Sequence, residues 1–378
     1  MRRQVMERQP TPSERVASRY ADLFVDLFSR VAADPRVPFV AASPSPQQGM
    51  DGVPFRGANA LVTSVAAARE GYHIPVWLTM ARKDSLGLMV RKGERGVPIT
   101  RYDFYYEDVG TGRRDPAMTD ALYSSLTDEE RRGWVRRCHM RCWTEFNIAQ
   151  TDFPDVYPEQ WAGLEALFGS RKAPVSCGIL DRMVDEGTWM CPVVPSGAAS
   201  TPLYVEDRDV IEVPPKGSYA DESRWYSDLL REMAHSTGSE GRMDRGLGSS
   251  SLTEVAAEEL VAELAGAVMG TFFGLQSTLG DHNVRFLKSW VTAIGETPEV
   301  IYRAVTMAAR VSDAAAGRLG VSLGAGVDVQ AVMDGIEAAR EAGMRAMERR
   351  AERAERIPAA RRGGRLPLPS AGRKGRRG

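Results

Sequence analysis

The stretch Leu229-Leu230-Arg231-Glu232-Met233-Ala234-His235-Ser236-Thr237-Gly238 decides how this chain is interpreted. As a helix, it places Arg231 and His235 one turn apart on one face, with Glu232 beside them. Zinc hydrolases hold their metal on such a helix, where two histidines stand four residues apart and a glutamate follows the first. Here Arg231 occupies the position of the first histidine, so the chemistry of the site depends on one arginine.

A second segment downstream, Glu258-Glu259-Leu260-Val261-Ala262-Glu263, matches the first. As a helix it places Glu259 and Glu263 on one face, and a carboxylate from a later helix is the remaining part of such a zinc site. A Glu-x-x-His pattern alone is common by chance, so Glu232 and His235 could belong to an ordinary helix face. The downstream glutamate pair is what favours a site.

A length of 378 residues is enough for two or three globular domains. The hydrophobic content of 43% is enough to form a core. The net charge is −1, but residues 341–378 hold 12 Lys and Arg against 4 Glu. A basic tail on an acidic body favours an anionic partner, nucleic acid before membrane. The alternative is a solvated helix end followed by a disordered tail without a fixed partner.

The cysteines and the apolar runs indicate a soluble, cytoplasmic protein. The four cysteines form neither a dense disulfide framework nor paired zinc knuckles, so we expect reduced thiols. The N-terminus is polar, so we expect no signal peptide. The longest apolar run, Leu264 to Phe273, is too short to cross a bilayer, so no membrane partner is expected.

The first half of the chain is predicted to be mixed in secondary structure. Apolar residues at helical intervals predict a helix over 12–33, capped by Thr11, and residues 34–54 read as an irregular connector. Residues 88–99 predict a strand, a glycine-bearing turn and a second strand. The turn carries Arg91, Lys92 and Arg95 and an aromatic strand follows, which suits single-stranded nucleic acid. The alternative is an ordinary surface hairpin whose aromatic rings lie in the core.

Further along, residues 107–133 read as a polar insertion that ends in a short helix, and residues 144–151 as the last strand of this domain. A second basic and aromatic cluster begins at the end of this insertion and reaches the strand; its members are Arg131, Arg132, Trp134, Arg136, Arg137, Arg141 and Trp143. Prolines mark a domain boundary near residue 155, and residues 159–215 are expected to alternate short strands and turns.

The second half is predicted to be mainly helical. Helices are expected near 221–238, 252–273 and 283–294, and from 298 to about 356 with a break at 320–326. The predicted class is therefore α+β. Residues 1–155 would form an α+β domain, 156–320 a mostly helical domain with a small sheet, and 321–378 a C-terminal helix and disordered basic tail.

The motifs, taken in order, resemble the ArdC-like antirestriction protein family. Its N-terminal domain is matched by Phe55-Arg56-Gly57-Ala58-Asn59, Trp77-Leu78-Thr79, Val90-Arg91-Lys92-Gly93-Glu94-Arg95-Gly96 and Phe146-Asn147-Ile148-Ala149-Gln150. Its zincin-type metallopeptidase domain is matched by Asp209-Val210-Ile211, Glu232 to Gly238, and Glu258 to Glu263. The resemblance covers roughly residues 14–310.

This resemblance implies a single-stranded DNA-binding domain followed by a metallopeptidase-like domain, in a protein of plasmids or phages that protects incoming DNA from restriction. A host restriction or DNA-processing protein is a further possible partner. The DNA-binding residues implied are Asn59, Trp77, Arg91, Lys92 and Arg95, with the aromatic residues between Tyr102 and Tyr106 as further candidates for stacking.

In the zincin-like motif, His235 matches the second histidine and Glu232 the general base. Glu259 is our choice for the third zinc ligand, with Glu258 as the alternative because spacing does not separate adjacent glutamates. Glu263 would orient an imidazole. The family pattern begins with histidine where this chain has Arg231.

The arginine makes a zinc cofactor doubtful. A guanidinium stays protonated and has no lone pair to donate, and it places a fixed positive charge where the dication would lie. The leading hypothesis is therefore a metal-free, catalytically inactive domain in which Arg231 pairs with Glu259 or Glu263. The alternative is an active zinc metallopeptidase that uses His235, Glu259 and a non-standard third ligand.

Overall fold

The structure is a computed structural model, and it describes residues 9–34, 36–37, 40, 45–169, 176–275, 277, 279, 281–320, 328–329, 334–336, 338, 341 and 345. The chain divides into two units, residues 1–329 and 330–378. In the second unit the few described residues are helical, and the predicted basic tail lies outside the described residues. The first unit holds every element discussed below.

The first helix, α1 (Pro12–Ala33), has the predicted bounds. The Glu14 amide donates to the Thr11 hydroxyl, at 3.3 Å, and the Thr11 amide donates to the Glu14 carboxylate, at 2.6 Å. This reciprocal pair satisfies amides that the first turn leaves without partners. The apolar face of α1 is buried in the core.

Four strands form the first sheet, in the order β1-β2-β4-β3. They are β1 (Gln48–Gly49), β2 (Val76–Thr79), β3 (Val97–Asp108) and β4 (Trp134–Asn147). β1 lies parallel to β2, and the other pairs are antiparallel. Helices α2 (Gly57–Glu70) and α3 (Met80–Ser85) flank β2 in sequence.

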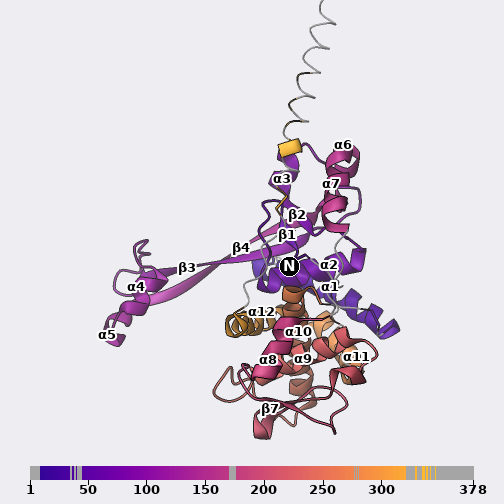
Figure 1. Cartoon of the computed structure of the whole chain (residues 1–378). Coiled ribbons are helices and arrows are strands. Elements are labelled where there is room, and N and C mark those ends of the chain that lie inside the picture. The colour runs from indigo at the N-terminus through magenta and orange to yellow at the C-terminus, as the bar shows by residue number, and fades with distance from the viewer. Residues whose placement is uncertain are drawn as a thin grey trace, which may run out of the picture. The chain divides into compact units, whose positions relative to one another are not determined.

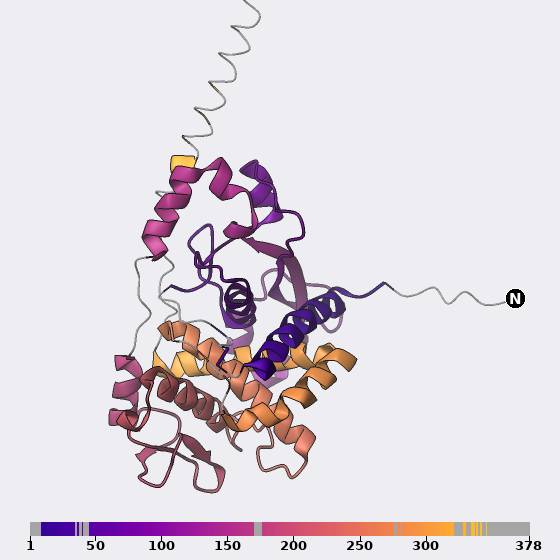
Figure 2. The same cartoon turned by 90° about the vertical axis from the view of Figure 1, so that its right-hand side faces the viewer.

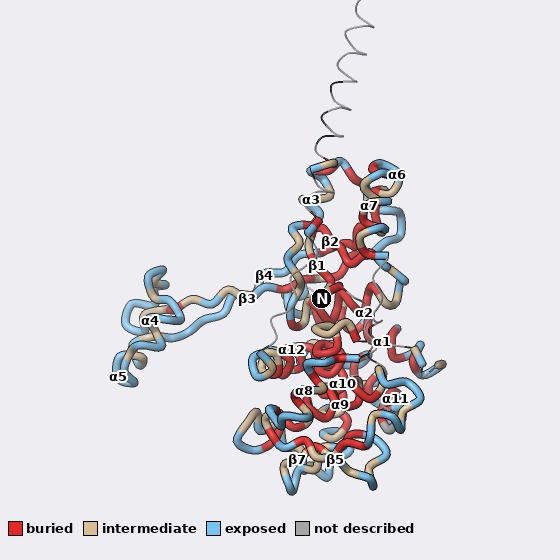
Figure 3. The backbone as a smooth tube through the Cα atoms, in the orientation of Figure 1, coloured by how far each residue is buried: buried red, intermediate tan, exposed pale blue. Residues whose placement is uncertain are grey.

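Strands β3 and β4 form a hairpin that extends from the sheet (Figure 1) and is largely exposed (Figure 3). Their register runs from Val97↔Glu145 to Asp108↔Trp134, and the connection carries the short helices α4 (Asp120–Ser125) and α5 (Asp128–Arg131). Two predictions were wrong here. Val90 makes only an isolated bridge, to Thr151, and the strand expected at 144–151 begins ten residues earlier. With both faces exposed, these strands lack the alternation of apolar and polar residues that marks a half-buried strand.

The region after the first sheet is more helical than predicted. Helices α6 (Phe153–Val156), α7 (Pro158–Gly169) and α8 (Gly178–Glu186) occupy much of the stretch expected to form short strands. The strands begin only afterwards, as β5 (Val193–Pro195), β6 (Leu203–Val205) and β7 (Val210–Val213). β7 is the central strand, parallel to β5 and antiparallel to β6.

Four helices complete the unit: α9 (Glu222–Ser236), α10 (Leu252–Phe273), α11 (Leu287–Glu296) and α12 (Glu299–Leu319). α10 packs between α9 and α12, while α1 and α2 pack against the C-terminal helices (Figure 2). Buried side chains from both halves therefore form one core cluster. The α+β class is confirmed, and none of the helices in the described part of the chain is long and apolar enough to span a membrane.

Candidate functional site

Helices α9 and α10 bring the two sequence motifs together around His235, as predicted. The Nδ1 atom of His235 lies 3.2 Å from Oε1 of Glu258, and its Nε2 atom lies 3.4 Å from Oε2 of Glu259. Spacing alone left open which of the adjacent glutamates would approach the imidazole. Both do, one at each ring nitrogen.

These carboxylates keep His235 charged. Burial lowers the pKa of His235, but the hydrogen bonds and charges of the neighbouring glutamates outweigh burial and raise this pKa to about 10. The imidazole therefore carries a proton at neutral pH in this arrangement, and a protonated ring has no lone pair for a metal.

Arg245, which sequence reasoning missed, holds Glu258 in place. Its guanidinium donates to both Glu258 oxygens, at 2.8 and 2.7 Å, and to the Ala234 carbonyl oxygen, at 2.9 Å. Burial raises the pKa of Glu258, and the hydrogen bonds from Arg245 and His235 more than reverse this. Gly238 makes room for the arginine, because a Cβ atom there would lie 2.8 Å from the guanidinium. No motif in the sequence pointed to Arg245, which lies in a loop.

Arg231 is buried with only 3% of its surface exposed, and acidic side chains surround it. Its Nη1 atom donates to Asp228 at 3.2 Å, and its Nε and Nη2 atoms donate to Oε1 of Glu232 at 3.1 and 3.0 Å. Oε1 of Glu263 lies 3.7 Å from Nη1. The sequence could have indicated Asp228, since it precedes Arg231 by three residues on the same helix.

Glu263 was predicted either to orient an imidazole or to pair with Arg231. Its carboxylate approaches Arg231, as the hypothesis of an internal ion pair predicted, and it accepts a 2.8 Å hydrogen bond from the side-chain amide of Asn283. The same amide donates to Oε2 of Glu259, at 2.8 Å, so it joins the two carboxylates one turn apart on α10. Asn283 was not identified from the sequence.

Both oxygens of Glu232 are engaged. Oε1 accepts from the Arg231 guanidinium, and Oε2 accepts from the backbone amide of Tyr204 on β6, at 2.8 Å. A general base needs an oxygen directed at the water it deprotonates. In this arrangement Glu232 acts as a partner of the arginine.

A zinc ion with three protein ligands does not fit this donor set. His235 and Glu259 supply two candidate ligands, but Arg231 occupies the position of the first histidine and neutralises the surrounding carboxylates. Among the described residues, no group of three or more His, Cys, Asp and Glu side chains is placed to hold a metal ion.

The basic turn predicted to contact DNA is exposed. Arg91, Lys92 and Arg95 all face solvent, and Lys92 and Arg95 line a polar pocket of about 370 Å³. Arg91 lies 3.5 Å from an Asp155 oxygen, an exposed pair of little strength. Within the described part of the chain, Lys92 and Arg95 form no ion pair, so their charges are available.

Two other residues predicted to contact DNA have structural roles. Trp77 is 1% exposed and its indole nitrogen donates to the Gln47 side chain, at 2.6 Å, so it cannot stack on bases as predicted. The Asn59 side chain donates to the Thr100 carbonyl oxygen at 2.9 Å and accepts from its amide at 3.0 Å, which attaches α2 to β3. Both the amide nitrogen and the amide oxygen of the Asn59 side chain are therefore occupied.

The aromatic residues of β3 divide between surface and interior. Tyr102 and Phe104 are 38% and 47% exposed, whereas Tyr106 is buried and stacks on Tyr123 with ring centroids 4.6 Å apart. The arginines of the second basic cluster are largely paired with acids of the hairpin: Arg131 with Asp128, Arg136 with Asp120, Arg137 with Glu107, and Arg141 with Asp103. This cluster therefore offers less uncompensated charge than its sequence indicates.

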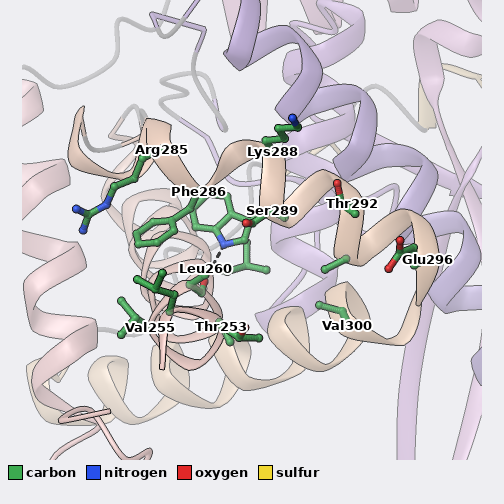
Figure 4. A pocket seen from close by; sticks show the side chains of 15 residues that line it. Thr253, Val255, Leu260, Arg285, Phe286, Lys288, Ser289, Thr292, Glu296 and Val300 are labelled. Carbon is green, nitrogen blue, oxygen red and sulfur yellow. Dashed lines mark hydrogen bonds between the residues drawn. The ribbon is translucent and has the colours of Figure 1, made fainter. Parts of the chain in front are cut away.

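An apolar pocket of about 870 Å³ lies at the start of α10, beside α11 (Figure 4). Its wall includes Phe286, Leu260 and Trp290, and the indole nitrogen of Trp290 donates to the Ala256 carbonyl oxygen at 2.7 Å. None of the residues predicted to form the zinc or DNA sites lines it.

The fold and the α9–α10 site define a zincin-like domain that follows an N-terminal domain built around a four-stranded sheet. Comparison with known families agrees: residues 194–307 match the zincin-like metallopeptidase family, and residues 17–136 match the N-terminal domain of anti-restriction factor ArdC. The chain is therefore an ArdC-like protein.

Its relatives include an uncharacterized protein of Sinorhizobium fredii, y4eC, which is 27% identical over 311 residues, 81% of this chain and 93% of the relative. The DNA primase TraC of Escherichia coli is 26% identical over 291 residues, 74% of this chain, which spans only 24% of TraC.

Among solved structures, the antirestriction protein ArdC from plasmid R388 has the same fold. Its metal-free structure gives a TM-score of 0.55 at 22% identity and covers 80% of this chain and 97% of that one. Its Mn(II)-bound structure gives a TM-score of 0.54 at 22% identity, with 79% and 97% covered.

Proposed function

We propose that this protein binds single-stranded DNA in the cytoplasm as an antirestriction-like factor of a mobile genetic element, and that its zincin-like domain is not a zinc peptidase. The observation that carries the DNA-binding role is the exposed turn of Arg91, Lys92 and Arg95. Two of its three charges have no ion-pair partner among the described residues. Such charges bind phosphates by releasing counterions.

Fluorescence anisotropy with labelled oligonucleotides tests the DNA-binding role. Single strands should bind more tightly than duplex of the same length, with affinity that falls as salt rises. Charge reversal in the variant Lys92→Glu/Arg95→Glu should weaken binding. It should also reduce the slope against log salt by about 0.7 for each phosphate that the variant no longer neutralises.

Arg303→Glu is the matched control, because Arg303 is an exposed residue of α12 that has no ion pair with other described residues. Equal affinity for duplex, or an equal loss in the control, would contradict the assignment.

The observation that supports an inactive zincin-like domain is the pairing of Arg231 with Glu232. The arginine supplies inside the protein the positive charge that zinc supplies in an active site. Its partner is the residue that would have to act as the base. The metal and the base are thus lost together, and the domain keeps its fold as a scaffold.

A second candidate function is a metal-dependent peptidase that uses His235, Glu259 and a non-standard ligand. Two features favour it: Nε2 of His235 faces Glu259, and a Mn(II)-bound structure exists for the R388 protein. Metal analysis of the purified protein separates the two functions. Stoichiometric zinc or manganese would overturn the scaffold proposal, whereas uptake of zinc only by Arg231→His would support it.

The antirestriction role is tested in cells. Transfer of a plasmid into restriction-proficient and restriction-deficient recipients, with and without this protein, should show protection only in the proficient host. The same protection by Glu232→Gln would indicate that peptidase chemistry is not needed. Loss of protection in that variant, with DNA binding intact, would favour the peptidase.

A further inference from the structure

A second pocket, of about 520 Å³, lies where α2, β3, β4 and α12 meet. Its volume is within the range of small-ligand pockets, about 300–1,000 Å³. The residues of the Phe55–Asn59 motif that line it have no role in the basic turn or the zincin-like site. One end of this pocket is cationic and the other is aromatic.

The cationic end is the start of α2. Arg56 is the N-cap residue but makes no capping hydrogen bond, and the backbone amides of Gly57 and Ala58 have no acceptor among the described residues. Free amides at the start of a helix of this length, together with the helix dipole, favour a phosphate. Arg56 and Arg310 lie on the rim, both exposed and without an ion pair in the described part of the chain, against one rim acid, Asp313.

The aromatic end is formed by Tyr102 and Phe104 of β3 and by Tyr302 of α12. Phe104 is exposed, and the guanidinium of Arg136 lies over its ring, 3.7 Å from the centroid. Tyr102 and Tyr302 join their hydroxyls by a hydrogen bond. Because these contacts already hold the aromatic side chains in place, little further ordering of the rings is needed for a base to stack on them.

A buried polar group also points to a ligand. Tyr20 is among the residues that line the pocket, and its side chain is only 1% exposed. Its hydroxyl makes no hydrogen bond of normal geometry with any described residue, although Thr100 lies close. Most buried hydroxyls have a partner, so an unpaired one in a pocket wall indicates a missing polar group.

The backbone explains why the pocket is built from this motif. Gly57 has a φ of +52°, and a Cβ atom there would lie 3.2 Å from the Cβ atom of Ala309, so glycine allows α2 to start directly beside α12. Asn59 then attaches the first turn of α2 to Thr100. The motif thus places the open start of a helix next to aromatic side chains.

We infer that this pocket binds one nucleotide of a single DNA strand, with a phosphate at the start of α2 beside Arg56 and Arg310 and the base on Tyr102 and Phe104. The inference deepens the proposed function and rests on it for the source of the nucleotide. A free nucleotide has the same chemistry. The test therefore includes three probes: a 12-nucleotide oligo-dT, a 12-unit abasic strand and dTMP.

The variants are Phe104→Ala and Arg310→Gln, with Phe104→Trp as the conservative replacement. Arg303→Gln, on the same helix as Arg310, is the control. Phe104→Ala should weaken oligo-dT binding about tenfold and leave abasic-strand binding unchanged, because a stacked base contributes roughly 1–3 kcal/mol. Phe104→Trp should restore affinity, and Arg310→Gln should weaken binding of both strands.

The outcomes separate the two claims. If wild type binds oligo-dT but Phe104→Ala and Arg310→Gln behave like Arg303→Gln, the pocket assignment is refuted and the DNA-binding role stands. If wild type binds no strand but binds dTMP in a manner sensitive to Arg310→Gln, the pocket takes a free nucleotide and the DNA-binding role fails. Binding of none of the probes refutes both. Thermal melting of each variant establishes that it is folded, and both substituted side chains are exposed.

Discussion

Replacing Arg231 by methionine should destabilise the protein strongly. Methionine keeps an unbranched apolar stem but leaves Asp228, Glu232 and Glu263 without the guanidinium, which lies 3.2, 3.0 and 3.7 Å from them. All of these side chains are at most 7% exposed. Removing one partner of a buried ion pair costs about 3–5 kcal/mol, because the remaining charges stay buried without compensation. We expect a loss of this size in the free energy of unfolding at pH 7.

Urea denaturation followed by circular dichroism measures this loss, with Arg303→Met as the control, which should lie within about 0.5 kcal/mol of wild type. Lowering the pH to 5 should reduce the loss in Arg231→Met, since the uncompensated negative charges can then be relieved by protonation. A loss below about 1 kcal/mol at pH 7 would refute the view that the arginine compensates buried carboxylates. It would leave the inactive-domain proposal without its physical basis.

Three further predictions concern the site and its support. The pKa of His235 is raised to about 10, so the protonated imidazole contributes stability that is fully present below pH 6.5 and is lost as pH rises toward 10. In thermal melts between pH 7 and 10, wild type should therefore lose more stability than His235→Gln. Gly238→Ala puts a methyl group 2.8 Å from the Arg245 guanidinium and should cost about 1–3 kcal/mol in urea denaturation, while Gly217→Ala, with no atom within 4 Å, should cost little. Asn59→Ala removes two hydrogen bonds to the backbone of β3 and should lower stability by about 1–3 kcal/mol, measured by the same denaturation; no change would show that α2 is held by packing alone.

Helices with a buried apolar face could be predicted from the sequence. The bounds of α1 and α10 agree with the spacing of their apolar residues and with the capping residues Thr11 and Gly274. The long β3–β4 hairpin could not be predicted, because strands exposed on both faces show no alternation of apolar and polar residues. Arg136 and its neighbours therefore looked like a basic cluster, when cross-strand acids in fact neutralise much of it.

The candidate site was predicted in part. Helical spacing within the two motifs predicted that His235 and Glu259 lie close together and that Arg231 pairs with a carboxylate. The spacing could not place Arg245, which lies in a loop, or Asn283, which lies in the short 3₁₀ helix η4 (Asp281–Phe286). Trp77 shows a further limit, because the resemblance that named it as a stacking residue does not say whether its ring lies in the core or on the surface.

The shared core of the two halves has a consequence for how this protein can change over time. Helices α1 and α2 pack against α10, α11 and α12, so the helices of the zincin-like half complete the hydrophobic core of the N-terminal half. Loss of an ancestral catalytic residue would not release those helices from selection, because their apolar faces would still be needed. If the zincin-like domain is inactive, as proposed, it is still retained for its packing against the N-terminal helices. Its buried polar centre can then change only where another positive charge takes the place of the metal.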